Sequence, residues 1–85
     1  MNGGEQAQER IRGVLRDHGR LNKDVSLLQA ESDLYQAGMT SHASINVMLA
    51  LEDAFEVEFP DHMLKRNVFS SIASIARALD QLITA

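Results

Sequence analysis

Three stretches of the chain place apolar residues three and four positions apart, and this spacing most limits the fold. It gathers apolar side chains along one side of an α-helix, and no stretch sustains the alternation of apolar and polar residues typical of a half-buried strand. The spacing predicts helices over residues 5–18, over about 41–56, and from residue 70 or 71 onward. An all-α fold is therefore expected.

Helix-breaking residues separate the three predicted helices. Gly19 is a natural stop for the first helix. Phe59–Pro60 interrupts the chain after the second, because the residue before proline avoids helical angles. A short turn of helix is expected over about residues 61–66. The connection over residues 20–40 is long for a compact domain but contains several apolar residues, so we expect it to pack against the helices.

These elements predict a small four-helix bundle that occupies residues 1–85 as a single domain. It has three main helices, one short helix and a long first loop. Hydrophobic residues make up 45% of the chain, which allows a modest core in a domain of this size.

Cysteine is absent from the sequence. Disulfides, thiolate metal sites and a cysteine nucleophile are therefore excluded. The N-terminus has no apolar signal region, and no apolar run is long enough to span a bilayer. We expect a cytoplasmic protein with no membrane partner.

Charge is distributed unevenly along the chain, whose formal net charge is −4. Residues 1–23 contain five Lys or Arg and three acidic residues, whereas residues 31–61 contain seven acidic residues and no Lys or Arg. An acidic middle segment repels phosphates, so nucleic acid is not an expected partner. It favours protein partners that present a basic patch.

The sequence offers little to support catalysis. A hydrolase would need a base facing Ser41, but its neighbour His42 points elsewhere because adjacent helical residues do not face each other. No two of His18, His42 and His62 have the i, i+3 or i, i+4 spacing of helical metal ligands. We expect neither an enzyme nor a metal site.

Ser41 stands at the predicted start of the second helix, three residues after Gly38. The start of a helix has free backbone N–H groups and the positive end of the helix dipole, so it stabilises a phosphate. The residues alone leave two roles open for Ser41, a helix cap and the attachment point of a phosphodiester.

Several short motifs occur in a fixed order around Ser41. The first two are Asp33–Gly38 and Gly38–His42, at the approach to the second helix and at its start. The next two are Leu51–Phe55, at the end of that helix, and Glu58–Asp61, just after it. The last is Asn67–Ile72, at the start of the final helix. This ordered set resembles the acyl carrier protein family, whose stretches read Asp-Leu-x-x-x-Gly, Gly-x-Asp-Ser-Leu, Leu-Glu-x-x-Phe, Ile-Pro-Asp and a Thr-Val-like turn. The resemblance covers essentially the whole chain.

The resemblance implies that a phosphopantetheinyl transferase attaches 4′-phosphopantetheine to Ser41 from coenzyme A. The thiol of this group, which the cysteine-free chain lacks, would carry acyl or aminoacyl groups as thioesters. The implied protein is a freestanding, monomeric carrier that performs no chemistry itself. A ligase would load the acyl or aminoacyl group, and a downstream transferase would receive it.

Four stretches also resemble a smaller group of freestanding bacterial carriers, some of which synthetase-like ligases charge with amino acids. They are Ala37–Ser41, Met48–Asp53, Glu58–Asp61 and Met63–Ile72. This favours a specialised carrier. The alternatives are the housekeeping carrier of fatty acid synthesis, and an unmodified helical adaptor that uses its acidic surface only to bind proteins.

The resemblance also implies a partner-binding surface and an acyl cleft. The chain departs from the family pattern at three positions where transferases and partner enzymes bind, Thr40, His42 and Asn46. Acids near the negative end of the second helix are unfavourable for the helix itself, so from the residues alone they either form a merely solvated face or serve another purpose. In the family, such acids contact basic patches on partners. Here these acids are Glu52, Asp53 and Glu56. Residues that either line a cleft for short acyl chains or form plain core are Met48, Phe55, Phe59, Met63 and Leu64.

Overall fold

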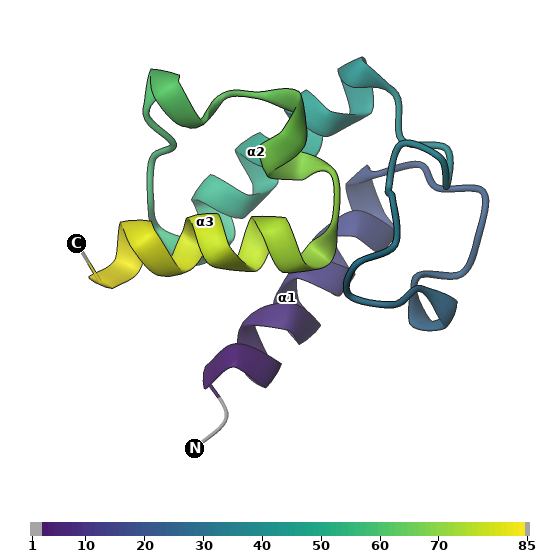
Figure 1. The fold of residues 1–85 in the computed structure, drawn as a ribbon, viewed down its shortest axis with the longest axis horizontal. Coiled ribbons are helices and arrows are strands. Elements are labelled where there is room, and N and C mark those ends of the chain that lie inside the picture. The colour runs from purple at the N-terminus through teal and green to yellow at the C-terminus, as the bar shows by residue number, and fades with distance from the viewer. Residues whose placement is uncertain (1–2, 85) are drawn as a thin grey trace.

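The computed structural model describes residues 3–84, and within them the chain is helical with no strand (Figure 1). The main helices are α1 (Gly3–His18), α2 (Ser41–Phe55) and α3 (Ile72–Thr84). Three short 3-10 turns are η1 (Val25–Leu27), η2 (Asp61–Met63) and η3 (Arg66–Phe69). The predicted all-α fold with three main helices and a long first loop is confirmed.

The short helix expected over residues 61–66 is divided between η2 and η3. Lys65, between them, has extended backbone angles (φ −123°, ψ 151°), which end one turn and begin the next. The connection from α2 to α3 thus consists of two short turns rather than one continuous helix.

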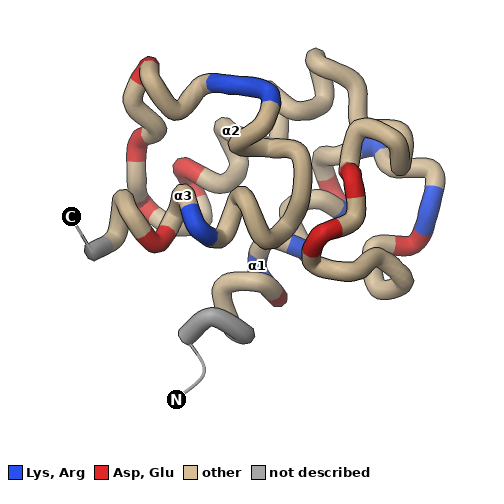
Figure 2. Tube along the Cα trace, in the orientation of Figure 1, with Lys and Arg blue, Asp and Glu red and all other residues tan. Residues whose placement is uncertain are grey.

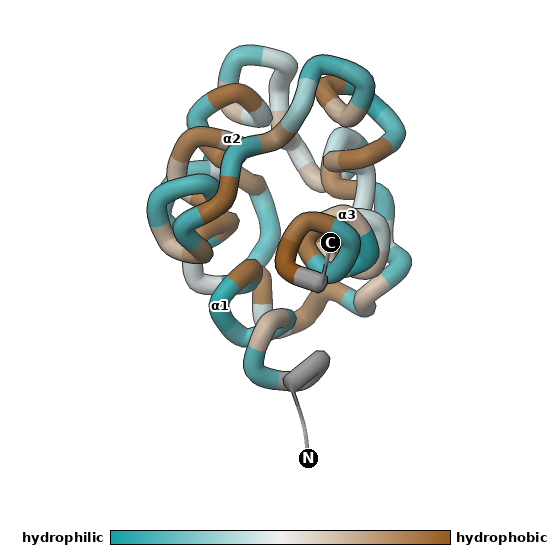
Figure 3. The backbone as a smooth tube through the Cα atoms, turned by 90° about the vertical axis from the view of Figure 1, so that its left-hand side faces the viewer, coloured by the Kyte–Doolittle hydropathy of each residue, from teal (hydrophilic) through white to brown (hydrophobic). Residues whose placement is uncertain are grey.

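The core lies where the three helices meet. α1 packs against both α2 and α3, and brown and teal stretches alternate along the helices in Figure 3, as expected of helices with one apolar side. The largest side chains with less than 2% of their surface exposed are Ile11, Leu15, Leu34, Val47, Leu51, Ile72, Ile75 and Leu79. Leu34 comes from the long first loop, so this loop contributes to the core as predicted.

Arg12 holds the first half of the long loop against α1. Its Nη1 donates to the carbonyl oxygens of Val25, at 2.7 Å, and Leu28, at 2.9 Å. Asp24 caps η1 by accepting from the backbone N–H and hydroxyl of Ser26, and these bonds lower the pKa of the Asp24 carboxyl.

The second half of the loop delivers the chain to α2. The Leu34 amide donates to the Ser70 carbonyl at 2.7 Å, which ties the loop to the start of α3. Gly38 has a φ of 113°, and a Cβ added there would lie 3.1 Å from the Asn22 amide nitrogen. Both the backbone angle and the close approach favour glycine at this position.

The far end of α2 is fixed by Arg10 from α1 and by its own Glu52. Arg10 donates to the Ala54 carbonyl at 3.1 Å, and its guanidinium lies 5.3 Å from the centre of the Phe55 ring. The Glu52 carboxylate accepts from the Phe59 amide at 2.8 Å. These contacts stabilise the C-terminal carbonyl groups of α2 and the turn that follows.

Reciprocal serine hydrogen bonds begin α3. The Ser71 hydroxyl accepts from the Ser74 amide at 3.0 Å, and the Ser74 hydroxyl accepts from the Ser71 amide at 3.1 Å. Of the two serines expected to cap this helix, Ser71 is the one that does so.

None of the helices in residues 3–84 is long and apolar enough to cross a membrane. The described side chains, those of residues 6–83, include no group of three or more His, Asp or Glu arranged to hold a metal ion.

Replacing Arg12 with methionine tests whether the loop depends on its two carbonyl contacts. We expect the Arg12→Met variant to lose about 2 kcal/mol of unfolding free energy, because hydrogen bonds from charged groups contribute about 1.5–3 kcal/mol. Arg16→Met is the matched control on the same helix, since the Arg16 side chain is 72% exposed and its one ion pair among the described residues is with its neighbour Asp17. Urea unfolding followed by circular dichroism should place the control within about 0.5 kcal/mol of the wild type. Equal losses in both variants would show that the loop contacts contribute nothing specific.

Candidate functional site

Ser41 is the first residue of α2, and Thr40 is its N-cap. The Thr40 hydroxyl oxygen accepts from the Ala43 amide at 3.0 Å. The role of helix cap left open for Ser41 is therefore filled by its neighbour. Ser41 is exposed, and no described side chain (residues 6–83) or backbone group (residues 3–84) makes a hydrogen bond to its hydroxyl.

The other serine hydroxyls are used within the fold. Each of the six makes a hydrogen bond to a backbone group or a side chain; they are Ser26, Ser32, Ser44, Ser70, Ser71 and Ser74. Among the seven serines of the chain, all within the described residues, Ser41 is therefore the one whose hydroxyl is left for external chemistry.

The surroundings of Ser41 suit a negatively charged group. The first turn of α2 contains no acidic residue, and its leading backbone N–H groups lie at the positive end of the helix dipole. A phosphate attached to the Ser41 oxygen would thus lie where the helix favours negative charge.

A groove of about 470 Å³ opens beside Ser41. One wall comes from α2, and the other comes from the first loop and the connection that contains η3. The lining residues are Tyr35, Ser41, Ser44, Ile45, Met48, Leu64, Lys65, Arg66 and Phe69. Its size is within the range of pockets that hold small ligands.

The acyl cleft predicted from sequence overlaps this groove in part. Met48 and Leu64 line it. Phe59 and Met63 are buried in the core, where the Phe59 ring makes an edge contact with Phe69 at 5.3 Å between centroids. Phe55 lies under the Arg10 guanidinium and lines a different hollow, formed with α1 and Ile83. For these three residues the alternative of core or packing residue fits the structure better.

Sequence reasoning missed most of the groove. Ile45 follows Ser41 by four residues, so the two lie on the same face of the helix, and this spacing could have placed Ile45 beside Ser41. In the structure the Ile45 side chain is 53% exposed. Tyr35, Lys65, Arg66 and Phe69 lie in the loop and connection, where no periodic pattern relates their positions to Ser41.

The six predicted partner-binding residues lie along α2 and at its two caps, and they differ in exposure. Thr40, His42, Asp53 and Glu56 are exposed, and Asn46 and Glu52 are half-buried. The Glu52 carboxylate is already bonded to the Phe59 amide, which gives it a structural role. Contact of these six residues with partner proteins remains a prediction.

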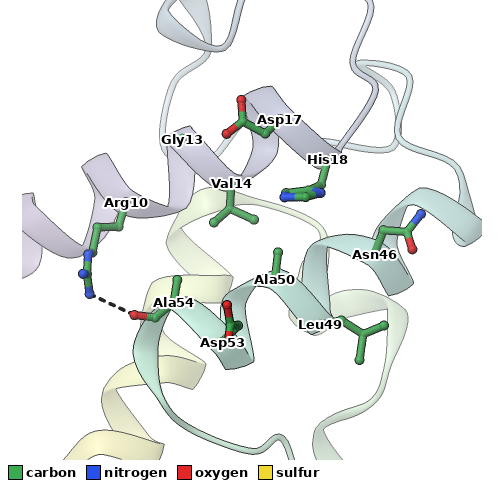
Figure 4. A pocket seen from close by; sticks show the side chains of 10 residues that line it. All are labelled: Arg10, Gly13, Val14, Asp17, His18, Asn46, Leu49, Ala50, Asp53 and Ala54. Atoms are coloured by element: carbon green, nitrogen blue, oxygen red, sulfur yellow. Dashed lines mark hydrogen bonds between the residues drawn. The ribbon is translucent and has the colours of Figure 1, made fainter.

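A second groove, of about 650 Å³, separates α1 from α2. Figure 4 shows Val14 and Ala50 pointing toward each other across it, with the bond from Arg10 to the Ala54 carbonyl at one end. Asn46 and Asp53 line this groove. Ser41 is not among its lining residues, so this groove is separate from the candidate attachment site.

Comparison with known proteins identifies the family. Residues 9–79 match the family described as "Phosphopantetheine attachment site". The chain belongs to this family. Its cofactor is accordingly phosphopantetheine, held by a covalent bond, and the exposed hydroxyl, the helix start and the adjoining groove described above fit that group.

Individual relatives agree with this assignment. The chain is 46% identical over 65 residues to the aminoacyl carrier protein of Agrobacterium fabrum, covering 76% of this chain and 78% of the relative. It also matches a chain in the crystal structure of an engineered Bradyrhizobium japonicum glycine:[carrier protein] ligase complexed with carrier protein from Agrobacterium tumefaciens and ATP. That match has a TM-score of 0.87 and 39% identity, and it covers 89% of this chain and 99% of the other.

A more distant structure supports the fold alone. It is the Bradyrhizobium japonicum glycine:[carrier protein] ligase complexed with glycylated carrier protein, matched with a TM-score of 0.74 at 22% identity. This match covers 86% of this chain and 97% of the other. The resemblance to carrier proteins noted in the sequence is thereby confirmed at the level of family and fold.

The different roles of Thr40 and Ser41 predict different effects on stability. Thr40→Ala should lower the unfolding free energy of the unmodified protein by about 1 kcal/mol, the usual cost of removing an N-cap side chain. Ser41→Ala should stay within about 0.5 kcal/mol of the wild type, because its hydroxyl supports no described contact and alanine suits a helix. Urea denaturation measures both. A loss in Ser41→Ala as large as that in Thr40→Ala would assign the cap to Ser41 instead.

Proposed function

We propose that the protein is an aminoacyl carrier that bears 4′-phosphopantetheine on Ser41. The observation that carries the proposal is that Ser41, alone among the serines, has an exposed and unengaged hydroxyl, at the start of α2 and beside a groove. The family match supplies the prosthetic group, and the 46% identical aminoacyl carrier protein supports the class of cargo.

Ser44 is the nearest alternative for attachment, and its geometry disfavours it. Its hydroxyl donates to the Ser41 carbonyl at 2.7 Å, and it lies one turn inside α2. Modification there would break this bond and place the phosphate away from the free N–H groups of the helix start. Ser41 meets neither obstacle.

The chain's own part in the reaction is to present an oxygen. The Ser41 hydroxyl gives up its proton to a base of the phosphopantetheinyl transferase, and its oxygen forms a bond to the phosphorus of coenzyme A that bears the pantetheine arm. The bond from that phosphorus to the bridging oxygen breaks, and adenosine 3′,5′-bisphosphate leaves. The attached group provides a terminal thiol for thioester formation, which the cysteine-free chain otherwise lacks. In this proposal the protein is not itself an enzyme, because it positions and delivers a thioester that partner enzymes make and consume.

A ligase that loads an amino acid is the proposed first partner after the transferase. The structures matched by this chain include carrier protein in complex with glycine:[carrier protein] ligase, which supports a partner of this class. Thr40, His42 and Asn46, which depart from the pattern of fatty acid carriers, fit a specialised partner set. The housekeeping role in fatty acid synthesis is accordingly the less favoured alternative.

The exposed surface of α2 is the proposed docking face for the ligase. Ile45 and Leu49 are each 53% exposed, and Asp53 lies one turn beyond Leu49. An apolar centre with acids at the C-terminal end of the helix fits a partner that presents an apolar patch with basic residues on one side of it. Thr40, His42, Asn46 and Glu56 complete the proposed contact set, while Glu52 acts chiefly within the fold.

Attachment is tested by incubating unmodified protein with coenzyme A and a promiscuous phosphopantetheinyl transferase. We expect the wild type and the Ser44→Ala control to gain the mass of one phosphopantetheine, and Ser41→Ala to gain none. Intact-mass spectrometry measures the gain, and fragmentation locates it. Absence of any gain in the wild type would contradict the proposal and favour an unmodified adaptor, and a gain in Ser41→Ala would move the site elsewhere.

The class of cargo is tested with the modified protein. A glycine:[carrier protein] ligase supplied with ATP and glycine should convert the thiol into a glycyl thioester, visible as a second mass increase that neutral hydroxylamine removes. A fatty acyl carrier ligase run in parallel tests the alternative. Efficient fatty acylation without any aminoacylation would overturn the aminoacyl assignment and leave the attachment site standing.

A further inference from the structure

The groove beside Ser41 carries an unexpected charge. Residues 25–76 contain seven acidic residues but only two cations, Lys65 and Arg66. Both cations line the groove, and no acidic side chain does. Figure 2 shows them as the blue stretch in the connection between α2 and α3. The positive charge of this largely acidic region is thus concentrated beside the candidate attachment site.

Arg66 is held in place by Tyr35, which comes from the first loop. Its guanidinium lies 3.8 Å from the centre of the Tyr35 ring, and the Tyr35 hydroxyl donates to the Arg66 carbonyl at 3.3 Å. Stacking on a ring leaves the N–H groups of a guanidinium directed outward in its own plane. Among the described groups, which are the side chains of residues 6–83 and the backbone of 3–84, no carboxylate or carbonyl accepts from the Arg66 guanidinium or the Lys65 ammonium.

We propose that Arg66, stacked on Tyr35 and assisted by Lys65, binds the phosphate of the prosthetic group. The apolar wall formed by Ile45, Met48 and Leu64 then receives the pantetheine stem. This inference rests on the attachment to Ser41 proposed above. Ser41 carries the phosphopantetheine arm through a covalent bond, whereas Arg66 and Lys65 hold the attached arm against the groove through non-covalent contacts.

Physical chemistry favours this pairing. A phosphodiester on Ser41 keeps a negative charge in a chain whose net charge is already −4, so nearby cations reduce the repulsion. Arginine can donate two parallel hydrogen bonds to a phosphate, and lysine adds a point charge. Because Lys65 and Arg66 are exposed, we expect each contact to shift the equilibrium between held and free arm by roughly two- to fivefold.

The experiment compares amide chemical shifts before and after modification in ¹⁵N-labelled protein. Intact mass first establishes that each variant carries the group. In the wild type we expect modification to shift the amides of Ile45, Met48 and Leu64, which lie along the proposed path of the stem. Arg66→Gln should reduce these shifts by about twofold or more, and Lys65→Gln should reduce them less.

Arg77→Gln is the matched control, because Arg77 is exposed on α3 and lines another hollow. It removes the same charge and should leave the groove shifts at their wild-type size. Raising the salt concentration should reproduce the effect of Arg66→Gln in the wild type, since exposed ionic contacts are screened.

Tyr35 is proposed as a positioning residue, and two substitutions separate its contacts. Tyr35→Phe keeps the ring under the guanidinium and should retain most of the shifts induced by modification. Tyr35→Leu removes the stack and should lower them toward the Arg66→Gln level. The unmodified spectrum of each variant serves as its own baseline, so a purely structural effect cancels.

The outcomes distinguish this inference from the one on which it rests. No mass gain on the wild type would refute attachment itself. A normal mass gain with groove shifts that are equal in the wild type and Arg66→Gln would refute the anchor and leave the attachment intact. Wild-type shifts confined to Ser41 and its neighbours would show a free arm, and would also overturn the anchor.

Discussion

The hydrogen bond from the Ala43 amide to the Thr40 hydroxyl determines where α2 begins, and the candidate site depends on it. With Thr40 as the cap, Ser41 occupies the first helical position and its hydroxyl is free of any structural task. Ile45 and Met48 then follow one and two turns later and line the groove that Ser41 opens. Had Ser41 been the cap, modification would have competed with the bond that starts the helix.

The long first loop contributes to the site although it contains only one short 3-10 turn. Arg12 secures its first half through two carbonyl groups, and Leu34 secures its second half through the core and the Ser70 carbonyl. Tyr35 follows Leu34 directly, so its ring is held at the groove by the same attachment. Gly38 then turns the chain toward α2 with a backbone angle that other residues seldom adopt. These contacts hold the loop against the helices and place Tyr35 at the groove.

Sequence periodicity predicted the three helices because each buries an apolar side in a common core, and Ile11, Val47 and Ile75 lie there. It did not separate core from groove, because an apolar side shows only that a residue avoids water. Phe59 therefore appeared equivalent to Met48. Tyr35 pairs with Arg66, which lies 31 positions away, and local spacing gives no sign of such a contact. Thr40 and Ser41 both have a hydroxyl group, so the sequence did not decide which of the two caps α2.

The opposite charges of the chain divide its surface between two tasks. Asp53, an exposed acid of α2, is not among the residues that line the groove beside Ser41, whereas Lys65 and Arg66 line it. A carrier must hold its arm between encounters and release it within them. Contacts between exposed charges contribute only about 0–1 kcal/mol each, so binding of a partner readily exceeds them. The weakness of the contacts at Lys65 and Arg66 is therefore what allows one groove to shelter the arm and still give it up to each enzyme in turn.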